Sequence, residues 1–324
     1  RFALVAGGPT GHVTALAEDR SGAVWVATAG DGVYRVARAP DGAARVERFA
    51  HAPADPASLA DDSVHALVVD RRGVLWIGTG AGLDRLARVG AGRAEFAHLT
   101  AASPAPLALA ESRVTALHED ARGRLWIGGV PGVSVLDSAR AAVRHHFHRY
   151  RTYRYGWGEA VSLSDDAAGR VWVATRSELM RLDPATGAFE YLRRDPTEPE
   201  GPASDLPTVV YRDASDVMWV GSNGFGVDVH DPKATRFHTL RRPAAMASRL
   251  GGFSVYTVFE DRAGALWIDA GLLYRHDRAT GALRSFETSS ARPDDFGNTG
   301  VWALVENPPG ALWAATYRGL FRYE

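Results

Sequence analysis

The stretch Asp70-Arg71-Arg72-Gly73-Val74-Leu75-Trp76-Ile77-Gly78-Thr79 decides the fold, because the 324-residue chain repeats it with variations along its whole length. The tryptophan of this phrase recurs every 46 to 51 residues, at Trp25, Trp76, Trp126, Trp172, Trp219, Trp267 and Trp313. Short alternating strands repeated at such a period are typical of propeller arrays. We therefore predict an all-β fold, a seven-bladed β-propeller with four antiparallel strands in each blade.

The first blade shows the pattern of one repeat. Alternating segments predict strands over 13–18, 23–28, 33–36 and 44–49. The turn from Asp19 to Gly22 joins the first two strands, since Asp bonds the backbone ahead of it and Gly accepts a positive φ. Later blades are expected to start near residues 64, 114, 161, 208, 255 and 301.

The two ends of the chain predict how the last blade is completed. The sequence after residue 301 supplies only three strands, while residues 1–5 resemble the fourth-strand phrase Arg48-Phe49. We expect residues 1–5 to form the outer strand of the last blade, which leaves no open seam. Residues 1–324 are thus expected to form a single propeller domain, and the abrupt ends suggest a fragment of a longer chain.

Two columns of the repeat are expected to be structural. The seven tryptophans are predicted to pack between blades, because an aromatic side chain buries a large apolar surface. The turn aspartates are predicted to shape their turns rather than to catalyse a reaction. They are Asp19, Asp70, Asp120, Asp166, Asp213 and Asp261.

Composition excludes several classes of function. The net charge of −1 gives no chain-wide basic field for nucleic acid, although a local basic patch stays open. The chain has no cysteine, which excludes disulfides, thiolate zinc sites and a cysteine nucleophile. No apolar run reaches the roughly 18 to 20 residues that span a bilayer.

The phrase Val-x-Ala-Leu-x-Glu-Asp-x-x-Gly-x-Leu-Trp-Ile-Gly-Thr-x-x-Gly-Leu-x-Arg-Leu resembles the two-component regulator propeller repeat, with its best copies at 13–36, 64–86 and 114–136. The loop 51–59 resembles that family too. The resemblance implies a periplasmic or otherwise extracytoplasmic sensor domain for signal transduction. Its output, a histidine kinase, hybrid two-component system or diguanylate cyclase, would lie outside this chain.

The same resemblance implies what the domain would and would not bind. It implies no catalysis by the domain and no cofactor, and a cue such as an oligosaccharide or a small anionic ligand. It also implies self-association or a second propeller in the full-length chain. Membrane attachment would come only through segments outside this chain, and no nucleic-acid partner is expected.

Candidate ligand-binding residues are expected on the face opposite the Asp-x-x-Gly turns, where loops meet ligands. Aromatic rings stack on sugars, and Arg forks hold carboxylate or sulfate. Packing against the next blade is the alternative role for these aromatics. The candidates are Tyr153, Arg154, Tyr155, Trp157, Arg176, Phe225, Tyr256, Trp302, Tyr317 and Arg318.

Other interpretations are weaker. His145, His146 and His148 share an outer strand, but no carboxylate pattern completes a site, so no metal is predicted. A streptogramin-lyase-like enzyme would need a His/Glu pair with a metal; Glu159 and His65 are candidate members that no spacing selects. A protein-interaction scaffold without a small ligand stays open as well.

Overall fold

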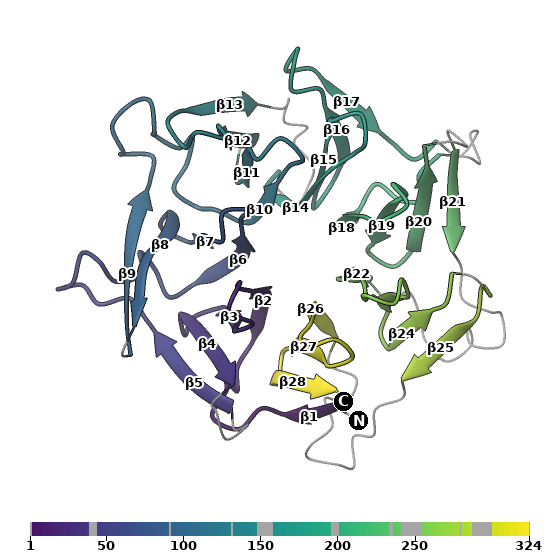
Figure 1. The fold of residues 1–324 in the computed structure, drawn as a ribbon. Coiled ribbons are helices and arrows are strands. Elements are labelled where there is room, and N and C mark those ends of the chain that lie inside the picture. The colour runs from purple at the N-terminus through teal and green to yellow at the C-terminus, as the bar shows by residue number, and fades with distance from the viewer. Residues whose placement is uncertain are drawn as a thin grey trace. The chain divides into compact units, whose positions relative to one another are not determined.

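The computed structural model describes residues 2–38, 44–90, 92–130, 132–147, 158–195, 201–232, 236–240, 254–278, 280–286 and 300–323. Every regular element in these ranges is a β-strand, and the strands form seven four-stranded antiparallel sheets (Figure 1). The predicted fold class is confirmed: the sheets are the blades of a seven-bladed β-propeller. No described helix is long and apolar enough to cross a membrane.

The chain divides into two compact units, which are described separately. The first comprises residues 1–129, 134–145 and 288–324 and holds blades 1, 2 and 7 with most of blade 3. Its strands are β2 (Val13–Glu18), β3 (Val24–Thr28), β4 (Val33–Arg38), β5 (Ala44–Phe49), β6 (Val64–Val69), β7 (Leu75–Thr79), β8 (Leu83–Gly90), β9 (Arg93–Leu99), β10 (Ala116–Glu119), β11 (Leu125–Gly128), β12 (Gly132–Leu136), β13 (Val143–Phe147), β26 (Val301–Glu306), β27 (Leu312–Thr316), β28 (Gly319–Tyr323) and β1 (Phe2–Leu4).

The second unit comprises residues 130–133 and 146–287 and holds blades 4, 5 and 6. Its strands are β14 (Ala160–Asp165), β15 (Val171–Thr175), β16 (Leu179–Leu182), β17 (Phe189–Leu192), β18 (Pro207–Arg212), β19 (Met218–Ser222), β20 (Gly226–Asp231), β21 (Arg236–Leu240), β22 (Val258–Glu260), β23 (Leu266–Asp269), β24 (Leu273–His276) and β25 (Leu283–Phe286). All blades start within three residues of the predicted positions.

The N-terminal strand completes the last blade, as predicted. β1 pairs antiparallel with β28, and Phe2 lies opposite Tyr323 while Leu4 lies opposite Phe321. The Val5 backbone N–H extends this pairing by donating to the Leu320 carbonyl at 2.9 Å. Figure 1 shows both chain ends at this sheet. The first and last segments are therefore held by one ladder of backbone hydrogen bonds.

Each repeated tryptophan is buried, with 0 to 8% of its surface exposed. Where both blades lie in one unit, the indole packs into the apolar core of the following blade. Trp25 clusters with Leu75 and Ile77 of β7, and Trp313 of β27 clusters with Val26 of β3. In the second unit, Trp172 clusters with Val220 of β19. Trp25, Trp172 and Trp313 thus each fill part of the core of a neighbouring blade.

The turn aspartates accept hydrogen bonds from the indole N–H groups of these tryptophans. In six blades the indole Nε1 donates to the turn aspartate at 2.7 to 3.1 Å. In blade 7, where Asn307 stands at this position, Trp313 donates to the Asn307 carbonyl instead. A buried indole N–H without an acceptor is costly, so the carboxylate lets the ring enter the core without that penalty.

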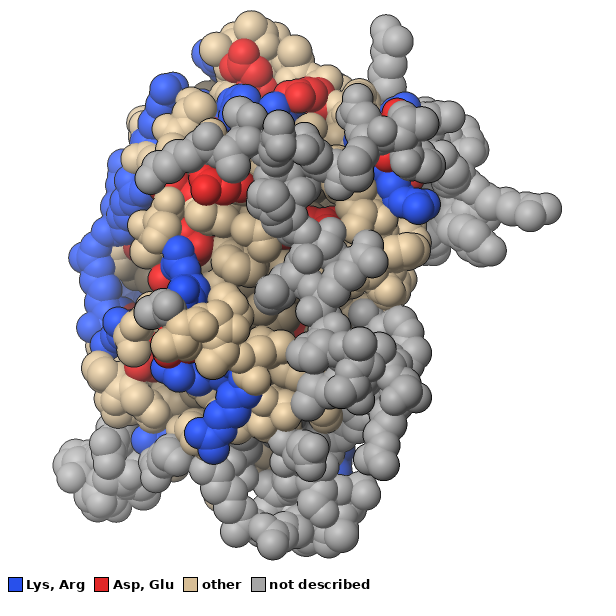
Figure 2. All heavy atoms as spheres, turned by 90° about the vertical axis from the view of Figure 1, so that its right-hand side faces the viewer, with Lys and Arg blue, Asp and Glu red and all other residues tan. Residues whose placement is uncertain are grey.

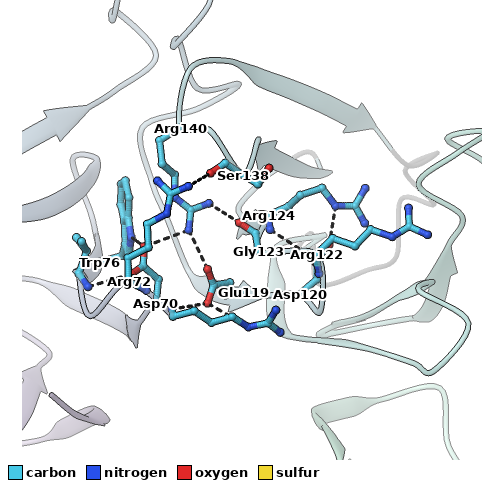
Figure 3. A network of polar contacts seen from close by, with 12 residues as sticks. Asp70, Arg72, Trp76, Glu119, Asp120, Arg122, Gly123, Arg124, Ser138 and Arg140 are labelled. Carbon is cyan, nitrogen blue, oxygen red and sulfur yellow. Dashed lines mark hydrogen bonds and ion pairs between the residues drawn. The ribbon is translucent and has the colours of Figure 1, made fainter. Parts of the chain in front are cut away.

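Arginines of the following blade bond to the turn aspartate, as Figure 3 shows for Arg140 and Asp70. Arg140, in the turn after β12, donates at 3.1 Å both to Asp70 of blade 2 and to Glu119 of blade 3. Its guanidinium lies 5.4 Å from the centre of the Trp76 ring, within range of a cation–π contact. Arg278 makes the corresponding pair of contacts in the second unit, with Asp213 and Glu260.

One departure from the repeat fits the backbone it must adopt. The fourth turn position has a positive φ in every blade, and it is glycine in six of them. Asp216 occupies it in blade 5 with φ of 67°. Asp is among the few non-glycine residues that adopt this conformation readily, and Arg212 pairs with its carboxylate. The turn is therefore kept without glycine.

The turn carboxylate should be a large contributor to stability. Asp70 accepts from the backbone N–H of Arg72 and Val74 and from the side chains of Trp76 and Arg140. We expect Asp70→Ala to lower the free energy of unfolding by about 3 kcal/mol, because it leaves a buried indole and a buried guanidinium without this acceptor.

Urea unfolding checks this prediction. Asp183→Ala is the control, since Asp183 caps a turn by accepting from the Ala185 N–H and is only partly buried. A loss after Asp70→Ala no larger than that after Asp183→Ala would contradict the proposed role of the indole and guanidinium.

Stability should fall in acid for the same reason. Burial raises the pKa of Asp19, Asp70 and Asp120, but the hydrogen bonds that they accept outweigh it and hold each pKa below 3.8. Their contribution is thus complete above about pH 4 and is lost as the pH falls through the folded-state pKa values. Urea midpoints at pH 5 and pH 3 should show this loss, and Asp70→Asn should reduce it; an unchanged pH dependence in Asp70→Asn would contradict the assignment.

Candidate functional site

The face opposite the Asp-x-x-Gly turns is shaped by a bulge at the start of the inner strands. In blade 1, Thr14 lies at the bulge, and its hydroxyl donates to the Val64 carbonyl of blade 2 at 2.7 Å. Thr208 makes the same link from blade 5 to the Val255 carbonyl. In blades 1 and 5 a threonine at the bulge therefore ties the inner strand to the next blade.

Blade 7 has a tryptophan at this position, and it forms an aromatic cluster instead. Trp302 lies at the bulge of β26. Its ring centre is 5.0 Å from that of Tyr317, in the β27–β28 loop, and 5.1 Å from that of His12, which precedes β2. The rings of His12 and Tyr317 are 4.3 Å apart. The three rings, called the aromatic cluster below, thus join blade 7 to blade 1.

The aromatic cluster has one exposed ring over two partly covered ones. Tyr317 is 51% exposed, whereas Trp302 and His12 are half-buried. Burial lowers the pKa of His12, so its imidazole is neutral at pH 7. Among the described residues, the buried Nε2 of His12 has no hydrogen-bond partner. The outer surface of the cluster is therefore an uncharged aromatic face.

The loop that carries Tyr317 is fixed from below. The Thr316 hydroxyl donates to the Gly319 carbonyl and accepts from the Arg318 N–H, each at 3.0 Å. Thr28, Thr79 and Thr175 bond the corresponding loops of other blades in the same way. Tyr317 and Arg318 thus project from a loop whose backbone is set by a buried threonine.

The other described candidates lie in the second unit and belong to three different blades. Arg176 donates to the buried carboxylate of Glu159 at 2.8 Å, so this arginine is held by an ion pair. Phe225, in the β19–β20 loop, is 50% exposed. Tyr256 is half-buried just before β22. The three therefore do not form one site within a single blade.

Several predictions fall elsewhere. Tyr153, Arg154, Tyr155 and Trp157 lie outside the described residues. No group of three or more described His, Asp or Glu side chains could hold a metal ion. Of the His145–His148 stretch, His145 lies on β13 with its Nδ1 2.9 Å from the Ser134 hydroxyl.

His12 is the member of the cluster that sequence reasoning missed. It precedes the first residue of an inner strand, a position that is Ser63 in blade 2, Glu159 in blade 4 and Leu206 in blade 5. This column is chemically more varied than any structural column of the repeat. That variation was a usable signal, because a position with no common structural task is free to differ from blade to blade.

Charge offers no comparable feature on the face drawn in Figure 2. Basic side chains line its left-hand edge, and acidic ones are scattered among uncharged residues nearer the centre. The described part of this face carries both signs, which suits the net charge of −1.

Three segments of the chain, residues 7–30, 58–81 and 108–130, match the family model described as two component regulator propeller. These segments are two-component regulator propeller repeats. They lie in blades 1, 2 and 3, and the resemblance seen in the sequence is confirmed. No curated protein matches the chain.

Solved structures share the fold of this chain. The extracellular domain of the putative hybrid two component system BT3049 from B. thetaiotaomicron is 14% identical, with a TM-score of 0.75 over 97% of this chain and 40% of that one. The extracellular domain of the putative one component system BT4673 from the same organism is 16% identical, with a TM-score of 0.73 over 99% of this chain and 39% of that one. This chain therefore spans about two fifths of those proteins.

An enzyme shares the fold as well. Virginiamycin B lyase from Staphylococcus aureus is 12% identical, with a TM-score of 0.67 over 99% of this chain and 97% of that one. At such identities, the likeness to either group concerns the fold, which hosts unrelated functions.

The packing of the aromatic cluster can be tested through His12. We expect Tyr317→Ala to raise the pKa of His12 toward 6.5, because it removes the ring that covers the imidazole. A histidine titration by NMR measures this, and Phe225→Ala, which changes an equally exposed ring in another unit, should leave the value unchanged. The same His12 pKa in wild type and Tyr317→Ala would show that Tyr317 does not cover it.

Proposed function

We propose that this chain is the extracytoplasmic sensor domain of a signal-transduction regulator and that it does no catalysis itself. The two-component regulator propeller repeats carry this proposal. The extracellular domains of the putative systems BT3049 and BT4673 support it through their common fold. The kinase or cyclase output and the membrane attachment would belong to other parts of a longer protein.

We further propose that the aromatic cluster receives the cue. Its exposed ring, Tyr317, stands over Trp302 and His12 and offers an uncharged surface of the kind on which a sugar ring stacks. Arg318, next in the chain, could hold an anionic group on the same ligand. An oligosaccharide, neutral or acidic, is therefore the proposed class of cue.

The ion pair between Glu159 and Arg176 is evidence against a lyase-like alternative. A metal-dependent lyase of this fold would need a His/Glu pair at the metal, and Glu159 was the candidate carboxylate. Glu159 is paired with Arg176 at 2.8 Å, which leaves it poorly placed as a metal ligand. The scaffold alternative differs from the sensor in having no small ligand at all, so a binding assay separates the two.

A glycan array probed with wild type, Trp302→Ala and Tyr317→Ala tests the proposal. We expect wild type to retain at least one class of glycan and both variants to lose most of that binding, because a stacking ring contributes roughly 1 kcal/mol or more. Phe147→Ala is the control and should bind like wild type, since it removes an exposed aromatic ring of β13 that is not among the candidate residues.

Three outcomes would count against parts of the proposal. Glycan binding that survives in both cluster variants but is lost in Tyr153→Ala/Arg154→Ala would move the site to the 150–157 stretch. Binding that survives in all variants would reject both locations. No binding by wild type would favour the scaffold.

A further inference from the structure

The loop of residues 51–62, which leads into blade 2, is an integral part of that blade. Leu59 is 1% exposed and belongs to the core that also contains Trp25 and Phe96. The Ala57 carbonyl accepts from the Phe96 N–H of β9 at 2.8 Å. The loop also reaches blade 1, since the Asp62 carbonyl accepts from the Gly32 N–H at 3.0 Å. Its position therefore affects both blades on the candidate face.

One buried carboxylate and one histidine fix the middle of this loop. Asp84 of β8 is fully buried, and its Oδ2 accepts from the Ala60 N–H at 2.8 Å. Its Oδ1 lies 2.7 Å from Nδ1 of His98, which stands opposite it on β9. The Nε2 of His98 lies 3.0 Å from the Pro56 carbonyl. Asp84 and His98 thus hold the loop at two points, Ala60 and Pro56.

The geometry requires both ring nitrogens of His98 to donate. A carboxylate and a carbonyl are acceptors only, and a neutral imidazole has a single N–H. With the proton on Nδ1 for Asp84, a neutral ring would present a lone pair to the Pro56 carbonyl. Both contacts are made together only by the imidazolium form.

The surroundings favour that charged form. The hydrogen bond to Asp84 raises the pKa of His98, burial opposes it less strongly, and the charge of Asp84 and the Pro56 carbonyl add to the increase. Asp84 is the charged side chain that acts on the imidazole. On the loop, Asp55 pairs with Arg93 of β9, and the His51 ring contacts the Leu59 carbonyl.

In two other blades, the positions that correspond to Asp84 and His98 do not hold an aspartate–histidine pair. In blade 5, Asp228 is buried and accepts from the Ala203 N–H at 2.9 Å, but Thr239 stands opposite it. In blade 3, His145 faces the Ser134 hydroxyl rather than a carboxylate. The chain thus offers a threonine and a serine as tolerated replacements at the two positions.

We propose that His98 is a pH-operated latch, which fastens the 51–62 loop to blade 2 while the imidazole is protonated and releases Pro56 when it is neutral. The sign follows from linkage: the stabilisation is complete below pH 6.5, the ordinary value for histidine, and is lost as the pH rises through the higher folded-state pKa. Protonation of His98 thereby makes the order of the 51–62 loop depend on pH. This loop contacts blades 1 and 2 on the face opposite the Asp-x-x-Gly turns.

Amide hydrogen exchange of the whole chain, corrected for the intrinsic pH dependence, tests the latch. We expect protection of Ala57 to Ala60 and of Phe96 to fall about tenfold between pH 6 and pH 8.5 in wild type, since a hydrogen bond to a charged group is lost. His98→Thr, which copies the residue at this position in blade 5, should show the lower protection at both pH values. The loop 100–112 of blade 3 is the internal control and should not change.

A histidine titration by NMR keeps the test decisive if a variant folds poorly. The pKa of His98 in wild type should lie above 6.5, and Asp84→Ser, which copies the residue at this position in blade 3, should lower it. A wild-type pKa at or below 6.5, or protection of Ala57 to Ala60 that does not change with pH, would overturn the proposal. Glycan binding enters neither measurement, so this test is independent of the proposed cue.

Discussion

The hydrogen bond between a buried indole and a turn aspartate, made in six blades, is the interaction on which the structure depends. A tryptophan has to enter the core of the next blade to fill it, and its N–H has to keep an acceptor there. The carboxylate six residues earlier provides that acceptor and, with its other oxygen, closes the turn. One side chain thus sets the hairpin and the junction between blades, which explains why Asp and Trp recur together.

Departures from the repeat are tolerated where another group takes over the lost task. Asn307 replaces the aspartate of blade 7, and its backbone carbonyl receives the indole. Asp216 replaces a turn glycine and keeps the left-handed backbone. At Trp302 and His12 the departures create an aromatic cluster, which joins two blades and also presents an exposed ring. Those positions are the natural places for a specific function on a repetitive scaffold.

The aromatic cluster and the His98 pair show two ways in which a blade acquires its own chemistry. Trp302 replaces a threonine that elsewhere ties two blades together, and three rings make the junction instead. His98 and Asp84 add a titratable contact to the loop of blade 2, whereas in blade 5 Thr239 stands opposite the aspartate. Both lie in the unit that also carries the three matched repeats, so recognition and its adjustment by pH would share one part of the chain.

The sequence by itself determined the fold, because the alternating strands, the turn residues and the tryptophan are local features that recur from repeat to repeat. It also placed residues 1–5 on the last blade through their likeness to other fourth strands. It did not find His12 or the partners of His98, because those contacts join residues 290 and 42 positions apart. Only the tertiary structure brings such residues together, since the packing of neighbouring blades and the course of the loops decide which side chains meet.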